Sequence, residues 1–218
     1  VQNILTLLPR LSDRLFKQHI VAQCKRLHGR TVMQMIGRCD DDSIGKARLF
    51  KDILPSLEAI AYLDGNPDVS LLLGQATDES GVLRKRYPEG VTRLGSLNSA
   101  RAATYEMIIR VSEVRSLGVR FDEDFGAGAK NYLGDEYIFV VDLIKAGGKA
   151  VFAPITLAQH PTESSGSRWG SDQDRRARAI IFTRVFGPLA PFVRLPFGIR
   201  RRRELGSLKN VLLFVLGR

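Results

Sequence analysis

The chain is poor in the residues on which several classes of protein depend. Its 218 residues include two cysteines (Cys24 and Cys39), three histidines and one tryptophan. Two thiols are too few for a disulfide framework, and these two lack the spacing of a metal site. No apolar run approaches the roughly 20 residues that a membrane-spanning helix needs, and the start shows no signal-peptide pattern. These absences predict a cytoplasmic protein with two reduced thiols.

Positive charge is what the chain has in excess. It carries 33 Lys and Arg against 23 Asp and Glu, a net charge of +10. Such a charge suits nucleic acid, an anionic membrane surface or a phosphate-bearing substrate. The basic residues gather in residues 10–38, 84–86 and 175–218, whereas the acids form short motifs between Asp40 and Glu136. Basic segments around acidic motifs favour a metal-dependent phosphate site, and without a recognition motif we expect no nucleic-acid partner.

Short apolar runs alternate with helical patterns, which predicts an α/β fold. We expect strands at 69–74, 82–87, 103–110, 150–152 and 155–158, with a hairpin turn at 78–81. We expect helices at 47–64, 111–118 and from Asp135 to Gly147, with a glycine-rich loop at 121–134 before the last. Three regions follow: a basic helical segment 1–39 with a short strand at 31–36, a core 40–170 and a basic helical tail 171–218.

Three adjacent acids, Asp40, Asp41 and Asp42, form the first candidate site. Because adjacent like charges repel one another, such a run is costly unless it is solvated or neutralised by a cation. Mg²⁺ and Mn²⁺ prefer carboxylate oxygens and commonly hold a phosphate as a further ligand. The run therefore indicates either a metal and nucleotide site or a solvated loop.

Two further candidates lie later in the chain. Asp135 and Glu136 open the helix expected after Gly134, where the helix N-terminus favours an ionised carboxylate. An ionised and oriented carboxylate suits a general base, but simple helix capping would explain the same pair. His160 ends an apolar strand and is either a metal ligand or a structural histidine.

Two features have weaker chemical meaning. Residues 121–126 lack the ligand spacing of a calcium loop, and we interpret them as a glycine-rich turn with Phe121 and Phe125 anchored in the core. The tail combines a run of four arginines, Arg200 to Arg203, with the apolar run 211–216. That combination indicates contact with an anionic membrane face or, alternatively, a packed terminal helix beside a solvated basic turn.

Several of these motifs occur in an order that resembles a known family. The run FDEDFGAGAKNYLGDEY (121–137) precedes an apolar helix, the turn KAGGK (145–149), Pro154 and His160. Residues 105–110, YEMIIR, resemble the strand that runs just upstream in that family. From Asn66 to Ser167, the order is similar to that of bacterial polysaccharide-type family 2 glycosyltransferases.

The resemblance implies a GT-A fold, a Rossmann-like sheet flanked by helices, with an acceptor-binding half after a nucleotide-binding half. It implies transfer of a sugar, with inversion, from a nucleotide-sugar to a hydroxyl of a glycan or lipid-linked acceptor in cell-surface polysaccharide synthesis. Peripheral contact with the cytoplasmic face of the inner membrane would fit this role. By the same resemblance, Glu136 or its neighbour Asp135 is the catalytic base, Asp42 and His160 bind Mn²⁺ or Mg²⁺, Asp40 and Asp41 contact the cofactor and nucleotide, and Gly126, Gly128 and Trp169 bind substrate.

The chain departs from the family pattern in three places. The family pair is usually Glu-Asp, whereas Asp135 precedes Glu136 here, and we choose the second position as the base. Residues 37–39 intervene between the apolar strand and the acidic motif. Only 39 residues precede Asp40, and one βαβ unit takes roughly 30 or more, so we expect the first part of the fold to be missing or replaced. The alternatives are an inactive fragment and a basic module that binds membrane or nucleic acid.

Overall fold

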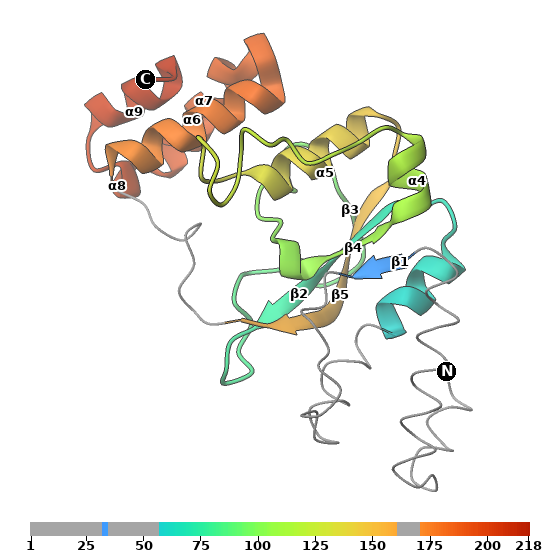
Figure 1. Ribbon diagram of the computed structural model, residues 1–218. Helices are drawn as coiled ribbons and strands as arrows, with labels where there is room; N and C mark the ends of the chain where they lie inside the picture. Colours follow the sequence, from blue (N-terminus) through green and yellow to red (C-terminus); the bar gives the residue numbers. More distant parts are fainter. Residues whose placement is uncertain (1–31, 35–56, 161–170) are drawn as a thin grey trace, which may run out of the picture.

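The computed structural model describes residues 32–34, for which only the backbone is considered, together with 57–160 and 171–218 (Figure 1). Within these ranges the chain is a mixed α/β protein, as the sequence predicts. Its sheet contains β1 (Val32–Gln34), β2 (Leu71–Thr77), β3 (Thr92–Arg93), β4 (Met107–Arg110) and β5 (Ala150–Gln159). The helical elements are residues 57–65, η2 (Thr104–Glu106), α4 (Val111–Ser116), α5 (Asp135–Lys145), α6 (Asp172–Phe186), η4 (Gly187–Leu189), α7 (Ala190–Arg200), α8 (Arg202–Leu205) and α9 (Leu208–Leu216).

The sheet is mixed, and its topology brings the ends of several strands to one edge. The strand order is β1-β4-β2-β5-β3. β2 and β5 are parallel, whereas every other pairing in the sheet is antiparallel. The carboxyl ends of β2 and β5 therefore lie at the same edge as the start of β4, which η2 directly precedes. Open α/β sheets bind ligands at this kind of edge.

Side chains alternate between the two faces of the sheet, and each face carries a helix. Leu71, Leu73 and Phe152 pack with α5, whose Phe139 and Leu143 are fully buried there. Their neighbours along the strands, including Leu72 and Val151, turn to the other face and pack with the helix at residues 57–65. This alternation follows from the two-residue period of a strand, and it produces a three-layer core.

The C-terminal helices form a second unit that stacks on α5, beyond the sheet (Figure 1). Ile181 and Val185 of α6 pack against Tyr137, Ile138 and Val141 on the outer face of α5. Helices α6, α7 and α9 then enclose a core of their own, in which Phe182, Phe197 and Phe214 meet ring to ring. The expected basic helical tail 171–218 is thus a packed helical bundle.

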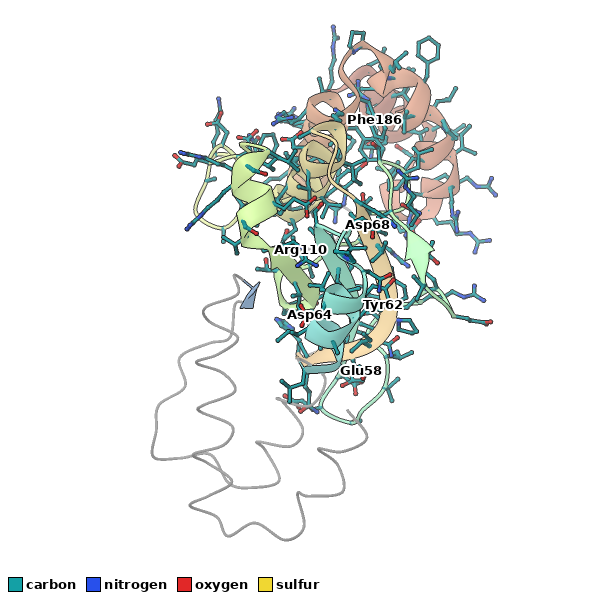
Figure 2. All side chains as sticks on the ribbon, turned by 90° about the vertical axis from the view of Figure 1, so that its right-hand side faces the viewer. Glu58, Tyr62, Asp64, Asp68, Arg110 and Phe186 are labelled. Carbon is teal, nitrogen blue, oxygen red and sulfur yellow. The ribbon has the colours of Figure 1, made fainter. Side chains whose placement is uncertain are left out.

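Arg110 ties the sheet to the helix at residues 57–65 at the edge opposite the candidate site. Its guanidinium donates to the backbone oxygens of Leu63, at 2.6 Å, and Val69, at 3.3 Å. Figure 2 shows Arg110 beside this helix, from which Glu58, Tyr62 and Asp64 are also labelled. The bond to Leu63 satisfies a carbonyl group in the last turn of the helix, which has no partner within the helix, and the bond to Val69 holds the segment between this helix and β2.

Most of the predicted elements in the described ranges are confirmed. Strands form at β2, β4 and β5, helices form at α4 and α5, and the loop at 121–134 separates them; β1 lies within the short strand expected at 31–36. The turn at 78–81 is also present, because the Asp78 carboxylate accepts from the backbone N–H groups of Ser80 and Val82.

Two predicted strands are wrong, and two other expectations hold only in part. The strand expected at 103–110 begins at Met107, because Thr104–Glu106 form the 3-10 helix η2. Phe121, expected in the core, is 39% exposed. Residues 82–87 form no strand, since only a single bridge joins Thr77 to Leu83. Pro154 does not divide β5 into two strands either. The pairing of β5 with β2 shifts there, and β3 pairs only with Val151 and Phe152. The missing N–H of Pro154 therefore costs no ladder bond with β3, which is how a strand tolerates proline.

Candidate functional site

The short turn η2 places three consecutive side chains in three different polar clusters. It lies at the carboxyl edge of β2 and β5, just before β4 begins. Thr104 contacts the predicted catalytic pair, Tyr105 stacks on His160, and Glu106 is buried in an ion pair. Because the three residues are adjacent in the chain, η2 brings all three clusters to one part of the molecule.

The first cluster contains the two carboxylates that open α5. Glu136 Oε1 accepts two hydrogen bonds from Thr104, one from Oγ1 at 2.7 Å and one from the backbone N–H at 3.3 Å. These bonds hold one oxygen of Glu136 in a fixed position. A general base must be oriented toward the proton that it accepts, and this geometry provides such an orientation.

Asp135 is held against Glu136 and against the glycine-rich loop. Burial, together with a hydrogen bond to Glu136 and the repulsion of its charge, raises the pKa of Asp135 to about 6. Gly126 closes the other side, because a Cβ atom at this position would lie 2.7 Å from the Asp135 carboxyl carbon. Gly126 also has φ +101°, a left-handed conformation that favours glycine. Asp135 is therefore confined between Glu136 and the glycine-rich loop.

The second cluster surrounds His160 at the end of β5. Its ring stacks on Tyr105, with centroids 4.4 Å apart, and its backbone N–H donates to the Thr77 carbonyl at 2.9 Å. Arg84 lies 3.1 Å from His160 Nδ1 and also donates to the Tyr105 hydroxyl. Since a guanidinium can only donate, Nδ1 of His160 is the acceptor of this hydrogen bond.

The third cluster is centred on Glu106, whose side chain is only 2% exposed. Lys85 Nζ donates to Glu106 Oε2 at 2.8 Å, and the Tyr87 hydroxyl donates to Oε1 at 2.6 Å. Burial lowers the pKa of Lys85, and the charge of Glu106 opposes that change. The pKa of Tyr87 is raised by burial and by its bond to Glu106. A buried carboxylate thus keeps both partners in their proton-bearing forms.

A cavity of about 360 Å³ opens beside the third cluster. Its apolar floor includes Leu73, Leu94 and Phe152, and its rim includes three cationic side chains. The volume is within the range of small-molecule sites, which combine apolar walls with a few polar groups. The cationic residues are Lys85, Arg86 and Arg101. With Glu106 as the only acid in the lining, the cavity suits an anionic ligand.

The structure brings together some of the predicted site residues. Asp135, Glu136 and Gly126 are in one cluster, and His160 reaches the same turn through Tyr105. Gly128 is exposed, has φ +85° and has no atom within 4 Å of a Cβ built on it. Asp40, Asp41, Asp42 and Trp169 lie outside the described residues, so their predicted roles stay predictions.

Sequence reasoning missed the partners that organise these clusters. Thr104 and Tyr87 occur in no motif, and nothing local predicts that Lys85 of the basic group 84–86 pairs with Glu106 of the segment 105–110. These contacts cross 19 to 32 positions of the chain. The one available signal was the sequence Thr104-Tyr-Glu106, three polar residues immediately before an apolar strand.

The described residues do not by themselves form a divalent metal site. Within these ranges, no group of three or more His, Cys, Asp or Glu residues is placed to hold a metal ion. Nδ1 of His160 already faces Arg84, a cation that disfavours a second positive charge nearby. The predicted ligands at positions 40–42 would have to supply the remaining oxygens.

Comparisons with known proteins identify no relative of this chain. No family model matches the chain, and neither a curated protein nor a solved structure is significantly similar to it.

Proposed function

We propose that the chain is the catalytic part of a GT-A-fold family 2 glycosyltransferase that transfers a sugar from a nucleotide-sugar to an acceptor hydroxyl. The observation that carries the proposal is the pair Asp135 and Glu136 at the start of α5. Burial and its neighbour raise the pKa of Asp135, Thr104 orients Glu136, and the pair lies at the carboxyl edge of the parallel strands. The motif order of the sequence supplies the reaction class.

In the proposed reaction, Glu136 is the general base and Asp135 its neighbour. The acceptor oxygen forms a bond to the anomeric carbon as the bond from that carbon to the diphosphate breaks. The electron pair of the broken bond leaves with the nucleoside diphosphate, and the acceptor proton moves to the Glu136 carboxylate. A single displacement of this kind inverts the anomeric centre, and charge develops as in other oxocarbenium-like glycosyl transfers.

The cationic rim of the cavity supports the choice of a phosphate-bearing donor. Lys85 is held in place by Glu106, and Arg86 and Arg101 are exposed beside it. A diphosphate carries its charge on several oxygens, and guanidinium groups match these with parallel hydrogen bonds. We propose that the cavity receives part of this donor or an anionic part of the acceptor.

Mg²⁺ or Mn²⁺ is the expected cofactor, with Asp42 and His160 as the proposed ligands and Asp40 and Asp41 beside them. When bound, the ion would neutralise the departing diphosphate. The described residues do not complete such a site, so residues 40–42 would have to supply the remaining ligands.

The proposal is tested first by binding and then by catalysis. Isothermal titration with UDP-, GDP- and TDP-sugars, with and without Mn²⁺, identifies the donor class. With that donor, Glu136→Gln is expected to abolish transfer and leave donor binding nearly unchanged, because the amide keeps the shape but cannot take a proton. Asp42→Asn should instead weaken donor and metal binding together.

The controls separate this mechanism from its alternatives. Glu123→Gln changes an exposed acid of the same loop and should leave transfer intact. If Asp135→Asn abolishes transfer and Glu136→Gln does not, Asp135 is the base. If the wild-type chain binds none of the donors, the proposal of a nucleotide-sugar enzyme fails for this chain.

A further inference from the structure

The C-terminal bundle exposes apolar side chains in two regular stripes. One face of α7 carries Phe192, Leu195 and Ile199, at spacings of three and four residues. The exposed fraction of each side chain is about one half or more. On α9 the stripe is Leu208, Leu212 and Leu216, at spacings of four. Phe192 is 74% exposed and Leu208 is 81% exposed. Regular exposed stripes differ from single surface apolar residues, which need no explanation.

Both stripes point away from α6. On α7, Phe197 stacks on Phe182 of α6, and the stripe lies about half a turn from Phe197 at 100° per residue. On α9, Phe214 packs on the same Phe182, and its stripe is again about half a turn away. The two stripes therefore cover the outer face of the bundle.

The two helices are close enough for their stripes to form one surface. A Cβ atom at Gly198 of α7 would lie only 3.3 Å from the Phe214 ring and 3.4 Å from a methyl group of Val211 on α9. Only a glycine permits this approach without displacement of the facing side chains. We call the six exposed residues, Phe192, Leu195, Ile199, Leu208, Leu212 and Leu216, the apolar face.

Positive charge accompanies the apolar face. Residues 187–218 contain seven Lys and Arg and a single acid, Glu204, and that acid is ion-paired with Arg201 at 2.7 Å. Arg200, Arg202, Arg203 and Lys209 are exposed between or beside the two stripes. Leu and Phe on one helix face, with Lys and Arg around them, is the composition of helices that lie in a membrane interface.

A transmembrane position fits the contacts less well. The helical stretch Asp172–Arg200 is long and apolar enough to cross a membrane by length and composition alone. However, its first half, α6, packs against α5 through Ile181 and Val185. Arg184 of α6 also forms ion pairs with Asp122, at 2.8 Å, and Asp142, at 2.7 Å. These contacts hold α6 in the folded protein and leave α7 and α9 outermost.

We propose that the apolar face is a docking surface for a bilayer that contains anionic phospholipid. In this arrangement α7 and α9 lie in the plane of the interface, with the apolar face toward the acyl chains and the arginines at the headgroups. A second copy of the chain is a poorer occupant, because it would bring two cationic surfaces together. The proposal does not depend on glycosyl transfer.

Vesicle co-sedimentation of the full chain tests this proposal. We expect binding to vesicles of phosphatidylcholine mixed with phosphatidylglycerol, and little binding to phosphatidylcholine alone. Arg202→Gln with Arg203→Gln should weaken binding about tenfold or more at low salt, because each basic residue near an anionic surface contributes about fivefold. Added salt should reduce the difference.

Apolar contact is tested separately. Leu195→Glu with Leu212→Glu should abolish binding, whereas Leu97→Glu, which alters a 76% exposed leucine outside the bundle, should not. Phe192→Ser is a milder variant of the same face, and thermal unfolding verifies that each variant folds. The proposal would be overturned if the wild-type chain bound no vesicles. It would also be overturned if the apolar-face variants bound vesicles as well as Leu97→Glu does. A second outcome would also overturn it: light scattering shows that the chain is a dimer, the double variant Leu195→Glu with Leu212→Glu is a monomer, and no vesicle binding is detected.

Discussion

Thr104 binds one carboxylate oxygen of Glu136 with both its side chain and its backbone, at 2.7 and 3.3 Å. The second carboxylate of the pair, Asp135, is buried beside Glu136 and has a raised pKa. Two adjacent acids at the start of one helix therefore experience different environments. Glu136 has one oxygen held by two donors, whereas Asp135 has the raised pKa; in the proposed reaction this difference would suit a division of roles between the two carboxylates.

Thr104→Val should weaken the link between η2 and α5. Valine keeps the shape of threonine and removes the hydroxyl, while the backbone N–H still reaches Glu136. A hydrogen bond to a charged group contributes about 1.5–3 kcal/mol, so we expect folding stability to fall by about the lower end of that range. Chemical denaturation measures the loss. Unfolding identical to that of the wild type would show that the Thr104 hydroxyl does not hold Glu136 in place.

Asp135 should make folding stability depend on pH. Its pKa is 3.8 in a model peptide and about 6 in the folded chain, so the native state binds more protons than the unfolded state between these values. Stability therefore falls as pH rises from about 4 to about 6 and then remains level. Asp135→Asn should remove this contribution and raise the melting temperature at neutral pH. Thermal unfolding across this pH range measures both effects, and a slope unchanged by the substitution would assign it to other groups.

The sequence predicts those parts of the fold whose signals are local. The helix from Asp135 begins at a glycine and ends before Gly147, as its pattern indicates. The strand expected at 82–87 fails because its apolar residues are two exposed side chains, Val82 and Leu83. Its polar residues instead reach across the site to Tyr105 and Glu106. Contacts of this kind depend on tertiary structure, which no local period encodes.

In the candidate site too, some residues can be recognised from local sequence and others cannot. Asp135 and Glu136 are recognisable from helix-start chemistry and motif order. Thr104 is not, because its contact with Glu136 spans 32 positions and forms only when η2 and α5 meet at the sheet edge. The burial that shifts the pKa of Asp135 is equally a property of the folded chain.

Glu106→Gln should destabilise the protein more than its isosteric shape suggests. The substitution leaves Lys85 beside a neutral amide in a largely buried position. Removing one partner of a buried ion pair costs about 3–5 kcal/mol, and we expect the lower end because Lys85 is 21% exposed. Chemical denaturation measures the loss. Lys85→Met combined with Glu106→Gln should cost less than the sum of the single changes, and strict additivity would show that the two charges are not coupled.

Two glycines of the loop before α5 provide a matched pair for the last prediction. Gly126 and Gly128 have similar positive φ angles, +101° and +85°. Alanine at either position therefore meets the same backbone strain, which costs about 1–2 kcal/mol. Their surroundings differ, because a Cβ atom at Gly126 would lie 2.7 Å from the Asp135 carboxyl group, whereas one at Gly128 has no neighbour within 4 Å.

Gly126→Ala should consequently change the titration of Asp135, whereas Gly128→Ala should not. Both variants should lose a similar amount of stability to backbone strain, but only Gly126→Ala should displace the Asp135 carboxyl group and change its titration. Since the displaced group gains access to water, its pKa should fall from about 6 toward 3.8. Unfolding measurements report the strain, and NMR titration reports the pKa. Equal titrations in the two variants would mean that Gly126 shapes the loop without positioning Asp135, and the loop would then have no direct part in the carboxylate pair.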